Sequence, residues 1–152
     1  MTEQFVMSEH TIVIERVLDA ARDLVWNAWT DPDEMTKWWG PEHFTTPREK
    51  IELDLRPGGV CRMTMVGPDG QEYPNDGHFG VVEPPERLSF GEETTEHPMI
   101  ESGETTVELV ELGEQRTKVI VTSRMICAAE LLDMAQAGWN SQLDKLESLL
   151  DT

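Results

Sequence analysis

Few residue patterns in this sequence predict chemistry at a reacting centre. Its four histidines are scattered, and none has the spacing of a metal site: His10, His43, His78 and His97. Neither a phosphate-binding glycine loop nor a Gly-x-Ser-x-Gly nucleophile motif occurs. His78, near Tyr73 in a strand pattern, is the one candidate for acid–base chemistry, but the spacing provides no partner for it. We therefore predict no catalytic residue, no metal ion and no cofactor, and we favour a role other than catalysis.

Sulfur-containing side chains form a more informative set. Cys61 and Cys127 do not form a Cys-x-x-Cys motif, so both are expected to be buried reduced thiols. Because strand side chains alternate, Cys61, Met63 and Met65 should share one face of a strand. Methionine fills irregular space and lines pockets that accept varied ligands. Either an ordinary core or a binding pocket would use such a face.

The pocket interpretation places this face opposite a long C-terminal helix, around a small apolar or aromatic ligand. Gly138 would leave open space on that helix. Tyr73 and His78 would supply the polar contacts. The full set of predicted ligand-binding residues is Cys61, Met63, Met65, Tyr73, His78, Phe79, Phe90, Met125, Trp139 and Leu143.

The helix that would cover this face is predicted from Glu130 to Thr152. Its apolar residues step by three or four, which places them on one helix face: Leu132, Ala135, Trp139, Leu143, Leu146 and Leu150. Gly138 lies in mid-helix, although glycine there costs about 1 kcal/mol relative to alanine. This indicates either close packing on a sheet or a helix that closes a cavity.

Most of the preceding chain has strand patterns. We expect one strand, two short helices and six further strands, at residues 11–18, 20–29, 32–39, 51–55, 60–66, 73–82, 87–90, 105–112 and 117–125. Residues 92–104 are acidic and are predicted to form an exposed loop. Strands and helices are segregated along the chain, which favours an α+β fold. We predict a flexible arm at residues 1–9 and a single domain at residues 10–152.

Charge restricts the partners. Thirty acidic and twelve basic residues give a formal net charge of −18. Such a surface repels phosphate groups, so we predict no binding to nucleic acid and none to anionic membranes. The apolar runs are too short to span a bilayer, and no secretion signal is visible, so a cytoplasmic protein is expected. Monomer and homodimer both remain open.

Several landmarks resemble those of one known family. Residues 20–41 carry the strongest likeness, and shorter landmarks follow in the same order: Arg56-Pro-Gly-Gly59, Gly67-Pro-Asp-Gly70, Gly77-His-Phe79, Pro85-Glu-Arg-Leu88 and Gly138-Trp139. Together they resemble the activator-of-heat-shock-protein-90-ATPase-like family, part of the START/birch-pollen-allergen-like (SRPBCC) superfamily. The resemblance implies a helix-grip fold, in which a curved antiparallel sheet wraps around the C-terminal helix and leaves a cavity between them.

The resemblance leaves three functions open. The chain is expected to bind a small apolar or aromatic ligand, to act as a polyketide cyclase or aromatase, or to engage a chaperone as the family's name suggests. An acid–base pair in the cavity would favour the enzyme. A small closed cavity with an apolar outer sheet face would favour the chaperone partner. Trp39 is expected to be structural in all three cases.

Overall fold

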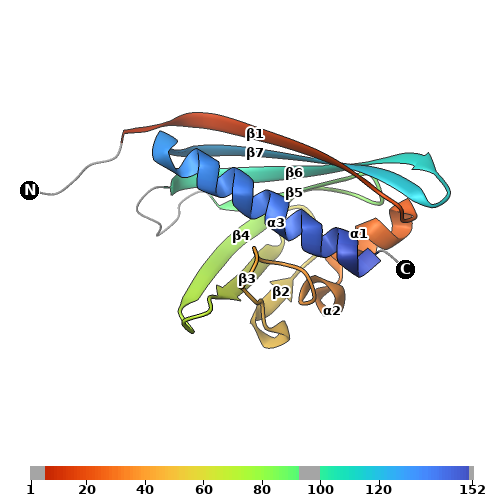
Figure 1. Cartoon of the computed structure of the whole chain (residues 1–152), viewed down its shortest axis with the longest axis horizontal. Helices are drawn as coiled ribbons and strands as arrows, with labels where there is room; N and C mark the ends of the chain where they lie inside the picture. The colour runs from red at the N-terminus through yellow and green to blue at the C-terminus, as the bar shows by residue number, and fades with distance from the viewer. Residues whose placement is uncertain (1–5, 93–99, 151–152) are drawn as a thin grey trace, which may run out of the picture.

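A single curved antiparallel sheet and one long helix make up most of the protein. The computed structural model describes residues 6–92 and 100–150. Seven strands form the sheet in the order β1-β7-β6-β5-β4-β3-β2, and the helix α3 lies across one face, here called the inner face (Figure 1). The predicted helix-grip α+β fold is confirmed.

The element boundaries place the two short helices directly after the first strand. The strands are β1 (Met7–Leu18), β2 (Ile51–Leu53), β3 (Val60–Val66), β4 (Glu72–Glu83), β5 (Arg87–Glu92), β6 (Ile100–Gly113) and β7 (Arg116–Ala128). The α-helices are α1 (Arg22–Thr30), α2 (Pro32–Met35) and α3 (Leu132–Leu150), and the short 3-10 helices are η1 (Arg48–Lys50) and η2 (Ala129–Leu131).

Two boundary predictions are corrected by strand pairing. β1 begins at Met7, where it pairs with Ala128, so residues 7–9 belong to the sheet and not to a flexible arm. β6 begins at Ile100 and extends the hairpin with β7 well into the acidic stretch predicted as a loop. Val6 of the predicted arm is exposed and precedes the strand, whereas residues 1–5 of the arm and residues 93–99 of the predicted loop lie outside the described residues.

The second short helix begins where its side chains predict but ends earlier: α2 stops at Met35, and residues 36–38 of the predicted 32–39 helix form turns, while α1 spans Arg22–Thr30 where residues 20–29 were predicted. The Asp31 carboxylate accepts a hydrogen bond from the backbone N–H of Asp33 at 2.9 Å and so caps α2. Pro32 occupies the first helical position, where its missing N–H is harmless. The indole Nε1 of Trp38 donates to the carbonyl oxygen of Ala28 at 2.9 Å, which ties the turn after α2 back to α1.

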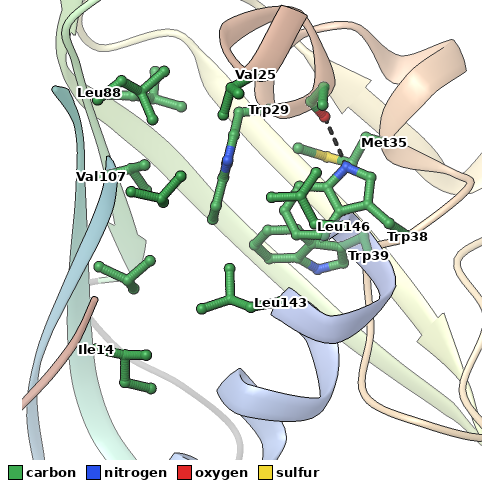
Figure 2. Packing of buried hydrophobic residues seen from close by; sticks show 14 of the residues in the cluster. Ile14, Val25, Trp29, Met35, Trp38, Trp39, Leu88, Val107, Leu143 and Leu146 are labelled. Carbon is green, nitrogen blue, oxygen red and sulfur yellow. Dashed lines mark hydrogen bonds between the residues drawn. The ribbon is translucent and has the colours of Figure 1, made fainter. Parts of the chain in front are cut away.

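Tryptophans join these helices to α3. Trp29 packs edge-on against Trp38, with ring centroids 4.7 Å apart, and both side chains are buried in the same cluster as Leu146 of α3 (Figure 2). Aromatic pairs at such distances prefer this edge-to-face arrangement. The expectation that Trp39 is structural is met, because Trp39 is buried in the same cluster.

Two polar contacts fix α3 along its length. The Arg16 guanidinium, on the inner face of β1, donates to the Asp144 carboxylate at 2.5 Å and to the Asn140 side-chain oxygen at 3.3 Å. On the other side of the helix, the Lys145 ammonium donates to the carbonyl oxygens of Gly40 and Phe44 at 2.9 and 3.3 Å. The helix is therefore held at the first strand and at the loop that follows α2.

Candidate functional site

A cavity of about 330 Å³ lies between α3 and the inner face of the sheet. The helix contributes Ala135, Trp139 and Gln142, and the segment after α2 contributes Trp39 and Pro41. The remaining lining residues come from β3 to β7: Cys61, Met63, Met65, Asn75, Gly77, Phe90, Gly91, Ile100, Gly103, Thr105, Ser123 and Met125. Small-molecule sites in proteins start at about this volume.

The sulfur-rich face of β3 does line this cavity. Strand alternation turns Cys61, Met63 and Met65 inward, while Arg62 between them is exposed and pairs with Glu52 at 3.2 Å. The structure also brings to the cavity three more residues of the predicted set: Phe90, Met125 and Trp139.

The other four predicted residues do not line the cavity. His78 is exposed on the outer face of β4, because it neighbours the inward-facing Gly77 and Phe79 in an alternating strand. Phe79 and Leu143 are buried in the core. Tyr73 lies near the start of β4, partly exposed, with its ring centroid 5.6 Å from that of Phe44.

Gly138 has open space beside it, as predicted, but it does not line the cavity. It is absent from the cavity lining, and a Cβ atom built there would meet no atom within 4 Å. The glycine therefore neither accommodates a closely packed neighbour nor provides space inside the cavity. The structure gives no physical reason for glycine at this position.

Other glycines shape the cavity wall instead. Gly91 on β5 and Gly103 on β6 lie on neighbouring strands, and a Cβ at Gly91 would lie 2.3 Å from the carbonyl oxygen of Gly103. A side chain at Gly91 would therefore force the two strands apart. Bare backbone forms the wall here, a feature that becomes visible only once the strand register is known.

Uncharged polar side chains interrupt the apolar wall. The hydroxyls of Thr105 and Ser123, opposite each other on β6 and β7, are 3.2 Å apart and both are buried. On α3, the Gln142 side chain is 6% exposed, and its Nε2 atom has no hydrogen-bond partner among the described residues. Leaving such a buried donor without a partner costs about 1–3 kcal/mol. Sequence reasoning missed Gln142, although a glutamine three residues after Trp139 in an apolar helix stripe was a usable signal.

No charged side chain lines the cavity among the described residues. Asp, Glu, Lys and Arg make up 28% of the chain, yet none of them, and no histidine, is part of the lining. An ion entering this cavity would lose its hydration without a compensating charge from the described lining residues.

The Gly40–Phe44 loop forms one side of the cavity and is fastened to α3. Besides the two hydrogen bonds from Lys145, the backbone N–H of Glu42 donates to the Ser141 hydroxyl at 2.6 Å. Burial lowers the pKa of Lys145 from its ordinary value, because the charged form loses solvation. Pro41 lies between these fastening points and lines the cavity.

A second, wider hollow lies on the outer face of the sheet. Its volume is about 820 Å³, and His78, Glu104 and Arg124 are among its lining residues. The Arg124 guanidinium forms an ion pair with the Glu9 carboxylate at 3.1 Å. No residue of α3 lines this hollow, whereas both the sheet and α3 line the inner cavity, which is itself partly open. Within residues 6–92 and 100–150, no group of three or more His, Cys, Asp or Glu side chains could hold a metal ion.

The curved antiparallel sheet packed around α3 places the protein in the helix-grip class of α+β domains. A family model described as "Activator of Hsp90 ATPase homolog 1-like protein" matches residues 19–151. The chain belongs to this family, as its sequence landmarks predicted. No curated protein matches the sequence.

Solved structures of bacterial proteins share the fold. Protein CV1439 from Chromobacterium violaceum is 26% identical with a TM-score of 0.84, and the match covers 93% of this chain and 97% of that one. Protein NE0264 from Nitrosomonas europaea is 25% identical with a TM-score of 0.76, over 92% of this chain and 93% of that one. The AHSA1 (SPO3351) protein from Silicibacter pomeroyi, 24% identical over 91% and 96% of the two chains, has a TM-score of 0.78 and supports the fold alone.

No helix in the described part of the chain is long and apolar enough to cross a membrane.

Proposed function

We propose that this protein binds a small, uncharged, apolar or aromatic molecule between α3 and the sheet. One observation carries the proposal: the described lining of the cavity has no charged residue, in a chain that carries a formal net charge of −18. Transfer of apolar surface from water into such a cavity is favourable by about 25 cal/mol per Å². The volume of about 330 Å³ suits a molecule of one or two fused rings.

The walls suit an aromatic guest. Trp39, Phe90 and Trp139 line the cavity, and the Trp39 ring centroid lies 5.8 Å from those of the other two. Aromatic edges and faces attract one another beyond the effect of buried area alone. Met63 and Met65 add unbranched, polarizable side chains that adapt to a ligand's outline.

The contacts favour binding over catalysis. General acid–base catalysis requires a titratable side chain within hydrogen-bond reach of the reacting group. Among the described lining residues, Cys61 contributes a thiol, but no carboxylate, histidine or lysine is present to exchange a proton with a ligand. The cyclase or aromatase alternative therefore has no contact that supports it.

The outer sheet face does not favour the chaperone alternative. Val13, Val110 and Ile126 are exposed on this face. Charged side chains in ion pairs lie among them and interrupt the apolar surface. The pairs include Lys118 with Glu15 at 3.4 Å and Arg87 with Glu108 at 3.9 Å. Interfaces that bury a stable core are instead depleted of charge at their centre.

Two alanines on α3 provide a matched test. Ala135 lines the cavity, whereas Ala137 is exposed. Equilibrium dialysis against naphthalene should show binding by the parent protein and by Ala137→Phe. Ala135→Phe should bind at least about tenfold more weakly, because its ring occupies the cavity. Equal binding by the two variants, or no binding by the parent, would reject the proposal.

A further inference from the structure

Gln142 lies on the apolar face of α3, at a position where the helix pattern predicts an apolar residue. It follows Trp139 by three positions and precedes Leu146 by four, so all three share the inner face of the helix. Although its side chain is only 6% exposed and lines the cavity, its Nε2 atom has no hydrogen-bond partner within the described part of the chain. Two other buried nitrogens without partners, Arg22 Nε and Trp29 Nε1, belong to residues that do not line the cavity.

A glutamine amide carries two N–H donors, and only a hydrogen-bond acceptor can satisfy them. The sheet side of the cavity adds further hydrogen-bonding capacity without charge. The Thr105–Ser123 pair uses one O–H for its mutual hydrogen bond, which leaves the second O–H for another acceptor. Asn75 on β4 also lines the cavity. The cavity is therefore apolar in its walls but supplied with neutral donors.

We infer that the ligand carries an uncharged oxygen acceptor, such as a ketone or amide carbonyl, and that the Gln142 amide donates to it. This inference rests on the proposed function. A carboxylate fits less well, since no Lys, Arg or His among the described residues lines the cavity to balance its charge. A pure hydrocarbon would contact the apolar walls of the cavity but would leave the buried Gln142 amide without an acceptor. The ligand class is thus a neutral aromatic carbonyl compound.

Recognition of this kind discriminates strongly between molecules of equal shape. A site with a buried donor rejects an analogue that lacks the matching acceptor, because the donor stays desolvated and unpaired. The pair 2-acetylnaphthalene and 2-ethylnaphthalene differs by a carbonyl oxygen in place of two hydrogens. The anion 2-naphthoate has a similar outline and adds a negative charge.

The experiment is equilibrium dialysis of the whole chain against each of the three compounds. The parent protein should bind 2-acetylnaphthalene about five- to tenfold more tightly than 2-ethylnaphthalene, and 2-naphthoate most weakly. Gln142→Met keeps the length of the side chain but removes the amide. It should bind 2-ethylnaphthalene at least as well as the parent and prefer the ketone by no more than about twofold.

A melting curve of each ligand-free variant separates recognition from a structural role. Removal of an unpaired buried amide should leave the melting temperature of Gln142→Met or Gln142→Leu unchanged or higher. A lower melting temperature in both variants would mean that Gln142 supports the fold, and would overturn the inference. So would a parent protein that binds both naphthalenes equally, or a Gln142→Met variant that keeps the preference. If the parent protein bound neither 2-acetylnaphthalene nor 2-ethylnaphthalene, the proposed function itself would be rejected.

Discussion

The indole rings of Trp39 and Trp139 meet edge to face, with centroids 5.8 Å apart and planes at 89°. Trp39 lies in the segment after α2 and Trp139 lies on α3, so the contact joins two segments that are far apart in the sequence. Both residues also line the cavity. The same contact therefore supports the fold and shapes the candidate site.

Truncation of these two tryptophans should have unequal effects on stability. Trp39 is 6% exposed, whereas Trp139 is only partly buried. Trp39→Ala should lower the free energy of unfolding by about 3–5 kcal/mol, and Trp139→Ala by about 1–3 kcal/mol, because less apolar surface is lost there. Urea denaturation followed by circular dichroism measures both. An equal or larger loss at Trp139 would contradict this account of its burial.

Lys145 should give the stability a specific pH dependence. Its pKa is lowered in the folded protein by burial, so between the folded value and the ordinary value of 10.5 the unfolded chain binds more protons. The cost of burying the ammonium is fully present below the folded pKa and disappears as pH rises through this window. The neutral amine can still donate to Gly40 and Phe44.

Lys145→Met is the variant that tests this dependence. It loses both hydrogen bonds and should be less stable than the parent by about 1–3 kcal/mol at pH 7. The difference in unfolding free energy between parent and variant should widen as pH rises towards 10.5, the ordinary lysine pKa. Denaturant titrations of both proteins across that range measure it. A difference that narrows with rising pH would show that the pKa shift has the opposite sign.

Gly91 and Gly103 should differ sharply in their tolerance of a methyl group. A Cβ at Gly91 would lie 2.3 Å from a backbone oxygen, whereas the nearest atom to a Cβ at Gly103 is 3.8 Å away. Gly91→Ala should destabilise the fold by about 1–3 kcal/mol or more, while Gly103→Ala should cost less than about 1 kcal/mol. Thermal denaturation compares the two. Similar melting temperatures would argue against the close approach of β5 and β6.

Met65 and Thr64 allow the cavity to be filled from the sheet side. Met65 lines the cavity, and its neighbour Thr64 faces the other side of β3. Met65→Trp should abolish naphthalene binding while the fold is retained, because the added ring enters existing space. Thr64→Trp should bind as the parent does. If Met65→Trp instead loses about 1–3 kcal/mol of stability, the region is a packed core and not a cavity.

The sequence predicted the fold well because its signals are local and repeated. Alternation defined the strands, a three-and-four spacing defined α3, and Asp31 with Pro32 marked a helix start. The same alternation correctly turned Met63 inward. Applied strictly, it would also have separated His78 from Phe79, because adjacent strand residues face opposite sides of a sheet.

The rest of the site depends on information that no single segment carries. The wall at Gly91 and Gly103 results from the register between β5 and β6. Pro41 lies at the cavity in a loop that Ser141 and Lys145 hold on α3, and Trp39 is held there by its ring contacts with Phe90 and Trp139. Gln142 lies on an apolar stripe, where its unpaired amide becomes apparent only from its burial and contacts.

The pairing of β1 with β7 also has a consequence for the assembly of the molecule. The first strand is hydrogen-bonded to the last, and α3, which follows that last strand, closes the cavity. Contacts between residues so distant in sequence can form only at the cost of closing a long loop. A chain that lacks α3 lacks one wall of the cavity. A ligand would stabilise the complete fold by mass action, without binding sites on incomplete chains that lack the helix.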